Sequence, residues 1–319
     1  MAQLSTDQIV ALTTAQVVAL STTQVAALTT EQVNSLASDD LQALTTAQVR
    51  ALTSDQIGNL AGSQVALMET ADIAALTSSQ APNLSTDAIV ALTTAQAVAL
   101  SSAALNALTS DQLAALETAD LAALTTTIIK QLSTAQVAQL STDQIVALTT
   151  AQVVALSTTQ VAALTTAQVN SLASDDLQAL TTAQVRALTS DQIGNLASSQ
   201  VALMETADIA ALTSSQAENL STDAIAALTT EQVVALSSAA LNALTSDQLT
   251  AIETADVAVL STAQISNLST KQVALLGTNQ IVALSTAQLA TLTTTQTNAL
   301  TTEQLGSMSS AQLASLSLS

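Results

Sequence analysis

The side chains in this sequence that could do chemistry are carboxylates and hydroxyls. Two carboxylates are adjacent at Asp39-Asp40, and four segments read Glu-Thr-Ala-Asp, beginning at Glu69, Glu117, Glu205 and Glu253. Paired carboxylates can act as general acid and base or as oxygen ligands of a metal. The chain has no Cys or His, which excludes thiol nucleophiles, imidazole bases and Cys/His metal sites. Because the acidic pairs recur along the chain, they suit a repeated surface better than one active site. The sequence therefore predicts a protein that is not an enzyme, with no catalytic residue, metal ligand or cofactor site.

Paired hydroxyls recur at a fixed spacing, as in Thr13-Thr14, Thr29-Thr30 and Thr45-Thr46. Regular threonine arrays of this kind resemble those of ice-binding proteins. A repeated hydroxyl and acidic surface could also grip carbohydrate or the surface of another cell. A binding module therefore stays open as the alternative function.

These residues belong to an octapeptide repeat. Counting in steps of eight from Leu4 to Leu316, every position is Leu, Met or Ile. We number the positions of this octad 0 to 7, with the leucine at 0. Position 5 is usually Val, Ile or Leu, and position 7 is mostly Ala. The expected core includes the position 0 and position 5 residues Leu12, Val17, Leu20, Val25, Leu148 and Val153.

Positions 1 and 4 carry the signals of a helix start. Position 1 is mostly Ser or Thr and position 4 is mostly Gln, as in the pairs Thr13 with Gln16 and Ser21 with Gln24. A Ser or Thr N-cap with Gln three residues later forms a capping box, in which each side chain satisfies a backbone N–H of the other residue. These four residues are therefore expected to be helix caps. Where Glu replaces the hydroxyl at position 1, we expect the carboxylate to serve as an alternative cap.

The charges agree with one short helix per octad. Acidic residues fall at positions 1, 3 and 4, with Glu218 as the exception, whereas Arg50, Lys130 and Arg186 lie at position 6. A helix start favours anions and a helix end favours cations. Position 6, which also accepts Gly58 and Pro82, is expected to face water, and the octad that contains Pro82 is expected to end its helix early.

Two other folds fit the pattern less well. In one long helix, with ~3.6 residues per turn, the leucine row would wind by about 80° per octad and never form a face. A β-solenoid would suit Thr, Val and Ile, but 5 Gly and 1 Pro are too few for a turn at every corner. The sequence predicts an all-α solenoid of about 40 octads, each with one short capped helix, because a lone octad cannot bury enough apolar surface to offset its ordering entropy.

The expected domain organisation is a single continuous solenoid over residues 1–319. A longer period lies over the octads, since the segment from Leu4 returns almost unchanged at Leu140. This period divides the chain into two homologous blocks, 4–139 and 140–275, and a divergent tail, 276–319. No polar capping repeat is evident at either end, which suggests a segment of a larger protein or a subunit that self-associates head to tail.

The net charge of −20 argues against nucleic acids and acidic membranes as partners. No apolar run approaches the ~20 residues of a membrane span, so no membrane insertion is expected. The octad enters directly at Met1-Ala2-Gln3-Leu4, which leaves no room for a signal peptide. We therefore expect either that the native N-terminus is missing or that export relies on another signal.

The segment from Leu12 to Leu20, LTTAQVVAL, resembles the opening helix of TAL effector DNA-binding repeats. That likeness ends there, because no second helix or base-reading loop follows. The chain as a whole resembles the Thr/Ala/Leu/Gln octapeptide tracts of giant secreted or surface proteins of proteobacteria, often labelled haem-utilisation or adhesion proteins. This resemblance implies an extracellular or cell-surface protein. The haem label finds no support, since no His, Cys or Tyr is present as an axial ligand. The leading hypothesis is therefore a bacterial structural scaffold: an extracellular stalk, spacer or filament subunit.

Overall fold

The computed structural model describes residues 3–317 and is helical throughout this range, with 38 short α-helices, one 3-10 helix and no strand. The prediction of an all-α solenoid is confirmed. The chain divides into two compact units, of which the first ends at Ala163 and the second begins at Leu164. This boundary lies three octads after the start of the second sequence block at Leu140.

The helices of the first unit are α1 (Thr6–Val10), α2 (Thr14–Val18), α3 (Thr22–Ala26), α4 (Thr30–Asn34), α5 (Ser38–Gln42), α6 (Thr46–Ala51), α7 (Ser54–Gly58), α8 (Gly62–Leu67), α9 (Thr70–Ala75), η1 (Ala81–Asn83), α10 (Thr86–Val90), α11 (Thr94–Ala99), α12 (Ser102–Ala107), α13 (Ser110–Ala115), α14 (Thr118–Ala123), α15 (Thr126–Gln131), α16 (Thr134–Gln139), α17 (Thr142–Val146), α18 (Thr150–Ala155) and α19 (Thr158–Ala163).

The helices of the second unit are α20 (Thr166–Ser171), α21 (Ser174–Gln178), α22 (Thr182–Ala187), α23 (Ser190–Gly194), α24 (Ser198–Leu203), α25 (Thr206–Ala211), α26 (Ser214–Asn219), α27 (Thr222–Ala226), α28 (Thr230–Ala235), α29 (Ser238–Ala243), α30 (Ser246–Ala251), α31 (Thr254–Val259), α32 (Thr262–Ser266), α33 (Thr270–Leu275), α34 (Thr278–Ala283), α35 (Thr286–Leu289), α36 (Thr294–Thr297), α37 (Thr302–Ser307) and α38 (Ser310–Ser315).

Most helices are capped by the Ser or Thr of position 1. At α18 the Thr149 side chain accepts from the Gln152 backbone N–H, and the Gln152 side chain accepts from the Thr149 N–H. These bonds satisfy two of the donors that a helix start leaves free. The Glu residues at position 1 behave differently: Glu69, Glu117, Glu205 and Glu253 make no side-chain cap bond. Their expected role as alternative caps is therefore wrong, and the partner residue at position 4 in these octads is Asp.

The helices end without a left-handed glycine. In many octads the Leu at position 0 takes an extended conformation, as at Leu156 with φ −58° and ψ 136°, and its N–H bonds the carbonyl of Val153 at 3.1 Å. The N-cap that follows is extended as well. Two extended residues therefore turn the chain from one helix to the next, and among the described residues no φ is positive. This explains how so few Gly and Pro can serve so many turns.

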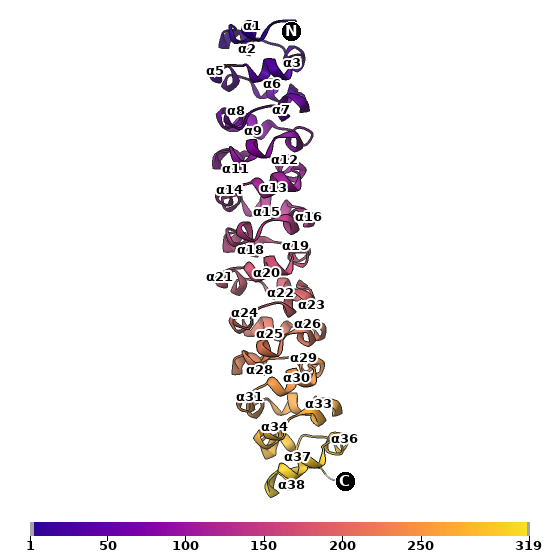
Figure 1. Ribbon diagram of the computed structural model, residues 1–319. Helices are drawn as coiled ribbons and strands as arrows, with labels where there is room; N and C mark the ends of the chain where they lie inside the picture. The colour runs from indigo at the N-terminus through magenta and orange to yellow at the C-terminus, as the bar shows by residue number, and fades with distance from the viewer. Residues whose placement is uncertain (1–2, 318–319) are drawn as a thin grey trace. The chain divides into compact units, whose positions relative to one another are not determined.

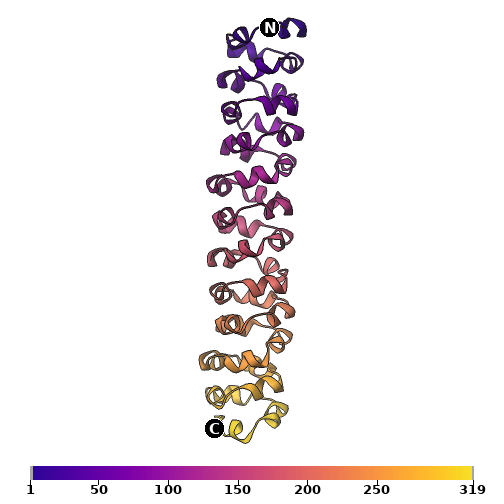
Figure 2. The same cartoon turned by 90° about the vertical axis from the view of Figure 1, so that its left-hand side faces the viewer.

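Within each unit the helices pack against the third helix after them, for example α6 against α9, and α9 against α11 with η1 counted between them. Three octads therefore make one turn of the solenoid. Successive turns follow one another along the colour gradient of each unit in both views (Figures 1 and 2).

The core is formed by positions 0 and 5. Val17, Val25 and Val153 are at most 1% exposed, and Leu148 is also buried. Leu12 and Leu20, which were expected in the core, are only half-buried. The position 0 side chain packs against the preceding turn, and these two residues lie in the first turn that the structure describes, so no earlier described turn covers them.

Position 6 faces water in most octads, as at Val10 and Arg50, but Gly58 and Pro82 are half-buried. At Gly58 the reason is a close approach, because an added Cβ would lie 2.9 Å from the Asn83 carbonyl oxygen of η1. Pro82 lies in the 3-10 helix η1, which is a single short turn. It ends at Asn83, the position at which α26 ends in the equivalent octad, so the expectation that this octad ends its helix early is wrong. The helix is shorter because it begins later, at Ala81.

Candidate functional site

The recurring polar feature of the structure is the position 4 glutamine, which joins one turn to the turn before it. Gln152 is 1% exposed, and its Oε1 accepts from the Thr149 N–H at 2.8 Å. Its Nε2 donates to the carbonyls of Leu121 and Leu124 at 2.9 and 2.8 Å. One side chain therefore caps the start of α18 and satisfies free carbonyls at the end of α14.

We call this arrangement the glutamine clamp: a position 4 Gln whose Nε2 donates to two carbonyls of the turn before, one from a position 5 residue and one from the position 0 residue that follows it. It recurs along both units. Clamps with both bonds are formed by Gln48, Gln56, Gln80, Gln96, Gln112, Gln144, Gln152, Gln160, Gln216, Gln232, Gln248, Gln272, Gln280, Gln288 and Gln304. Buried amides with all their bonds made fix the register between turns as well as stabilising it.

The residues singled out as caps show the difference between the cap and the clamp. Thr13 with Gln16, and Ser21 with Gln24, form capping boxes. Gln16 and Gln24 are nevertheless exposed, because they lie in the first turn of the described chain. The clamp itself was missed by sequence reasoning. A signal for it exists: Glu suits a capping box as well as Gln does, yet no octad has Glu at position 4. Only the amide supplies the donor that the preceding turn needs.

Six octads have Asp at position 4 in place of Gln, and all six Asp side chains are buried. Three of these carboxylates, those of Asp40, Asp208 and Asp256, accept a hydrogen bond from a threonine of the turn before. The Thr14 hydroxyl donates to Asp40 Oδ1 at 2.9 Å, and the Thr230 hydroxyl donates to Asp256 Oδ1 at 2.7 Å. The shorter acidic side chain therefore receives a donor instead of supplying one.

Asp72 and Asp120 are the least satisfied members of this group. They are 2% and 1% exposed, and their Oδ2 atoms have no hydrogen-bond partner among the described residues. Burial, together with the nearby Glu69 carboxylate, raises the pKa of Asp72 to about 6, although the Glu69 backbone N–H opposes the shift. Burial also raises the pKa of Asp208; the Thr182 hydroxyl opposes this and Glu205 adds to it.

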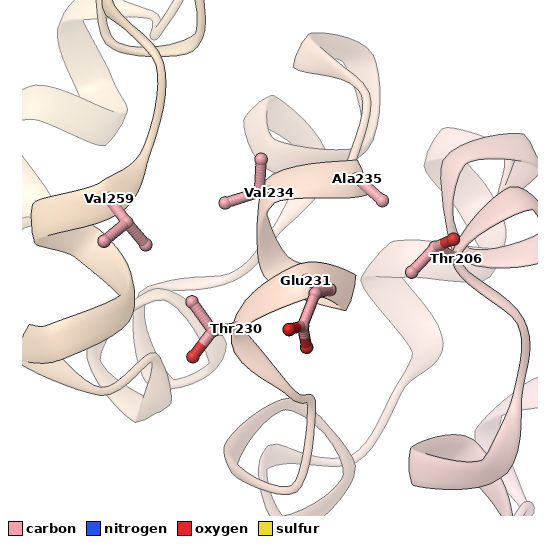
Figure 3. A pocket seen from close by; sticks show the side chains of 6 residues that line it. All are labelled: Thr206, Thr230, Glu231, Val234, Ala235 and Val259. Carbon is pink, nitrogen blue, oxygen red and sulfur yellow. The ribbon is translucent and has the colours of Figure 1, made fainter.

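Among the hollows on the surface of the described residues, two differ in character. An open groove of about 470 Å³ is lined by side chains of α25, α28 and α31, and Figure 3 shows these as Thr206, Thr230, Glu231, Val234, Ala235 and Val259. The groove is largely apolar, and its two valines are 40% and 49% exposed. It holds no pair of groups suited to acid–base or nucleophilic chemistry.

The second hollow, of about 360 Å³, lies in the first unit beside α9 and has a different character. Its polar lining residues are Arg50, Thr77, Ser78 and Ser101. The rest of its wall is made by Ala74, Ala75, Leu76 and Ala103. A guanidinium with adjacent hydroxyls can bind a carboxylate or a polyol.

Over residues 3–317, no three Asp or Glu side chains gather in a group that could hold a metal ion. The Asp39-Asp40 pair is split, since Asp40 is buried and Asp39 is exposed. No helix in this part of the chain has both the length and the apolarity that crossing a bilayer requires.

A search of curated proteins finds no match to this chain. The model of one repeat family, the ALTTAQ repeat, matches it in eight places: residues 1–38, 34–68, 65–102, 113–150, 146–174, 170–204, 201–238 and 249–286. Each matched stretch spans at least three octads and therefore at least one turn of the solenoid. Together the matches cover most of the sequence, and the chain belongs to the ALTTAQ repeat family.

Proposed function

We propose that this chain is a non-enzymatic structural scaffold: an extracellular stalk, spacer or filament subunit that associates end to end. The observation that carries the proposal is the glutamine clamp. The position 4 amides hydrogen-bond each turn to the one before, and the same bond pattern recurs through both units. Their repeated role is therefore structural. The extracellular placement is supported by the resemblance to octapeptide tracts of secreted and surface proteins.

The two edges of the described chain support association between copies. At one edge Gln8, Gln16 and Gln24 are exposed, and within residues 3–317 their amides make no bond to an earlier turn. At the other edge, Leu313 is 36% exposed. A second copy of this chain, or further octads, could add a turn to either edge. That turn would contact the same hydrogen-bond donors, acceptors and apolar side chains that an internal turn contacts.

The test is the concentration dependence of assembly by residues 1–319, followed by sedimentation velocity and negative-stain electron microscopy. We expect particles to lengthen by whole copies as concentration rises. The triple variant Q8E/Q16E/Q24E should stay monomeric at the same concentrations. Each Glu keeps the oxygen that accepts from the N-cap but loses the donor.

The matched control is A47E/A135E/A151E, which adds the same charge at exposed position 3 sites, where acidic residues are common in this chain. It should assemble as the parent does. Unchanged assembly by the glutamine triple variant, with unchanged circular dichroism, would exclude the edge amides as the contact.

The second candidate is an adhesin or binding module for carbohydrate, ice or a cell-surface ligand. The hollow beside α9 favours this candidate, because an arginine and three hydroxyl residues among its lining suit an acidic saccharide. Binding of glucuronate-containing oligosaccharides that is lost in R50A and retained in K130A would support this candidate over the scaffold. Ice shaping by the purified chain would instead support the threonine array.

A further inference from the structure

The position 4 aspartates differ from the glutamines in one chemical respect: an ionised carboxylate has no proton to donate. In a glutamine clamp the second acceptor is the position 0 carbonyl of the turn before, as Leu124 is for Gln152. The equivalent carbonyl for Asp72 belongs to Leu44, and among the described residues no donor bonds it. Asp72 Oδ2 is itself buried without a partner in that part of the chain.

An ionised Asp72 therefore leaves two unsatisfied acceptors where the start of α9 meets the turn before it, which is costly in a buried site. A protonated carboxyl resolves both, since its O–H takes the place of the amide N–H. Oδ1 remains free to accept from the Glu69 N–H, which already bonds this side chain.

We propose that the Asp72 carboxyl is an acid-dependent clamp: on taking a proton from solvent it donates to the Leu44 carbonyl and ties α9 to the turn before, and on losing the proton it loosens that contact. The solenoid turn at α9 is then more stable at mildly acidic pH than at neutral pH. This device adds regulation to the scaffold and does not depend on whether copies assemble.

The charged groups around Asp72 agree with this direction. Glu69 lies on the same helix start and disfavours a second negative charge. Of the helices packed against α9, α6 carries Arg50 in its last turn and α11 carries no ionisable residue. Arg50 lines the pocket beside Ala74 and Ala75, the last two residues of α9, and the charge that acts on the pKa of Asp72 is that of Glu69. The helix before Leu44, α5, carries only the acidic residues Asp39 and Asp40.

The direction in which pH changes the stability follows from the protons bound by the folded and unfolded states. The pKa of Asp72 is about 6 in the folded chain against 3.8 for the ordinary group. At this carboxyl the folded state therefore binds more protons than the unfolded state between these values. The contribution of Asp72 to stability is greatest below pH ~4 and is lost as pH rises through 6.

The experiment is urea unfolding of the full chain, at a series of pH values from 4 to 7.5, for the parent, D72Q and D87N. D72Q installs the glutamine clamp, whose donor is present at every pH. We expect the ratio of the unfolding equilibrium constants of parent and D72Q to rise at least about tenfold from pH 4 to pH 7, and to level off above pH ~6. D87N removes one charge at an exposed site and should leave the pH dependence of the parent nearly unchanged.

Identical pH dependence in the parent and D72Q would overturn the proposal. A second measurement does not rely on any variant folding: the Asp72 side-chain carboxyl is followed by ¹³C NMR in the labelled parent chain. Titration near 6 supports the acid-dependent clamp, and titration near 4 overturns it.

Discussion

One glutamine side chain acts as two caps in this solenoid. A helix as short as these has almost all of its N–H and C=O groups within its free ends. Intrahelical bonds alone therefore cannot satisfy it, and such a helix is unstable by itself. Oε1 of Gln152 serves the start of its own helix, and Nε2 serves the end of a helix in the turn before. Local and long-range order thus depend on the same residue.

Replacing Gln152 by Glu isolates the long-range half of this role. Glu keeps the capping box but places a carboxylate against the carbonyls of Leu121 and Leu124, so we expect a loss of about 3 kcal/mol in the free energy of unfolding at pH 7. The loss should shrink as pH falls and the new carboxyl is protonated. Urea unfolding measures both effects.

Gln24 provides the control for that substitution. It forms the same capping box with Ser21 but is exposed and makes no bond to an earlier turn of the described chain. Q24E should change stability by less than about 0.5 kcal/mol. Equal losses in Q152E and Q24E would show that the cap, and not the clamp, carries the energy.

At the scale of the helix, the chain contains its own comparison. The octads Thr77–Leu84 and Thr213–Leu220 differ only at one position, which is Pro82 in the first and Glu218 in the second. The first forms the 3-10 helix η1 and the second forms α26. Both keep the clamp, since the position 4 glutamine of each octad bonds its two carbonyls at 2.8–2.9 Å. The clamp therefore tolerates a change in helix type.

We expect P82E to convert η1 into an α-helix, because it restores the N–H that proline lacks, and to stabilise the chain by about 1 kcal/mol. New amide protection at residue 82 in hydrogen exchange would show the added bond. An unchanged 3-10 turn would mean that packing against α7, not proline, shortens this helix.

Close approach between turns makes a separate prediction at Gly194. A Cβ there would lie 2.7 Å from the Asn219 carbonyl oxygen, so G194A must push α23 away from α26. We expect a loss of about 1–3 kcal/mol by urea unfolding. At Gly306, in the interior of α37, an added Cβ would meet nothing within 4 Å, and G306A should instead stabilise the chain by up to about 1 kcal/mol.

At the scale of the whole molecule, the sequence predicts what is repeated but not how the repeats meet. The octad pattern predicts the short helix and its cap, because both depend on contacts between residues of the same octad. The number of octads per turn depends on contacts between octads that are distant in sequence. Because the octads have similar sequences, the sequence does not show which of them pack together. Leu12 and Leu20 illustrate this, since their type is that of the core but their turn has no predecessor in the described chain to cover them.

Because every clamp reaches back by the same number of octads, removing one whole octad should preserve the fold. If residues 101–108 are deleted, Gln136 moves into register with the carbonyls of Ala97 and Leu100, which are the position 5 and position 0 residues that a clamp requires. We expect the circular dichroism per residue to stay unchanged. Deleting only residues 105–108 would shift every later octad of the unit by half a repeat against the turn before, and should abolish cooperative unfolding of the first unit.

Three helices per turn also set a rule for how a gene of this kind can change length. Gain or loss of the coding sequence for a single octad leaves the core intact, so recombination between copies is tolerated structurally. Each such event turns all later exposed side chains of that unit by one third of a circle, and the original alignment returns only when the net gain or loss is a multiple of three octads. Length is therefore free to drift, whereas any ligand or neighbour that reads a column of surface residues constrains the octad count in multiples of three.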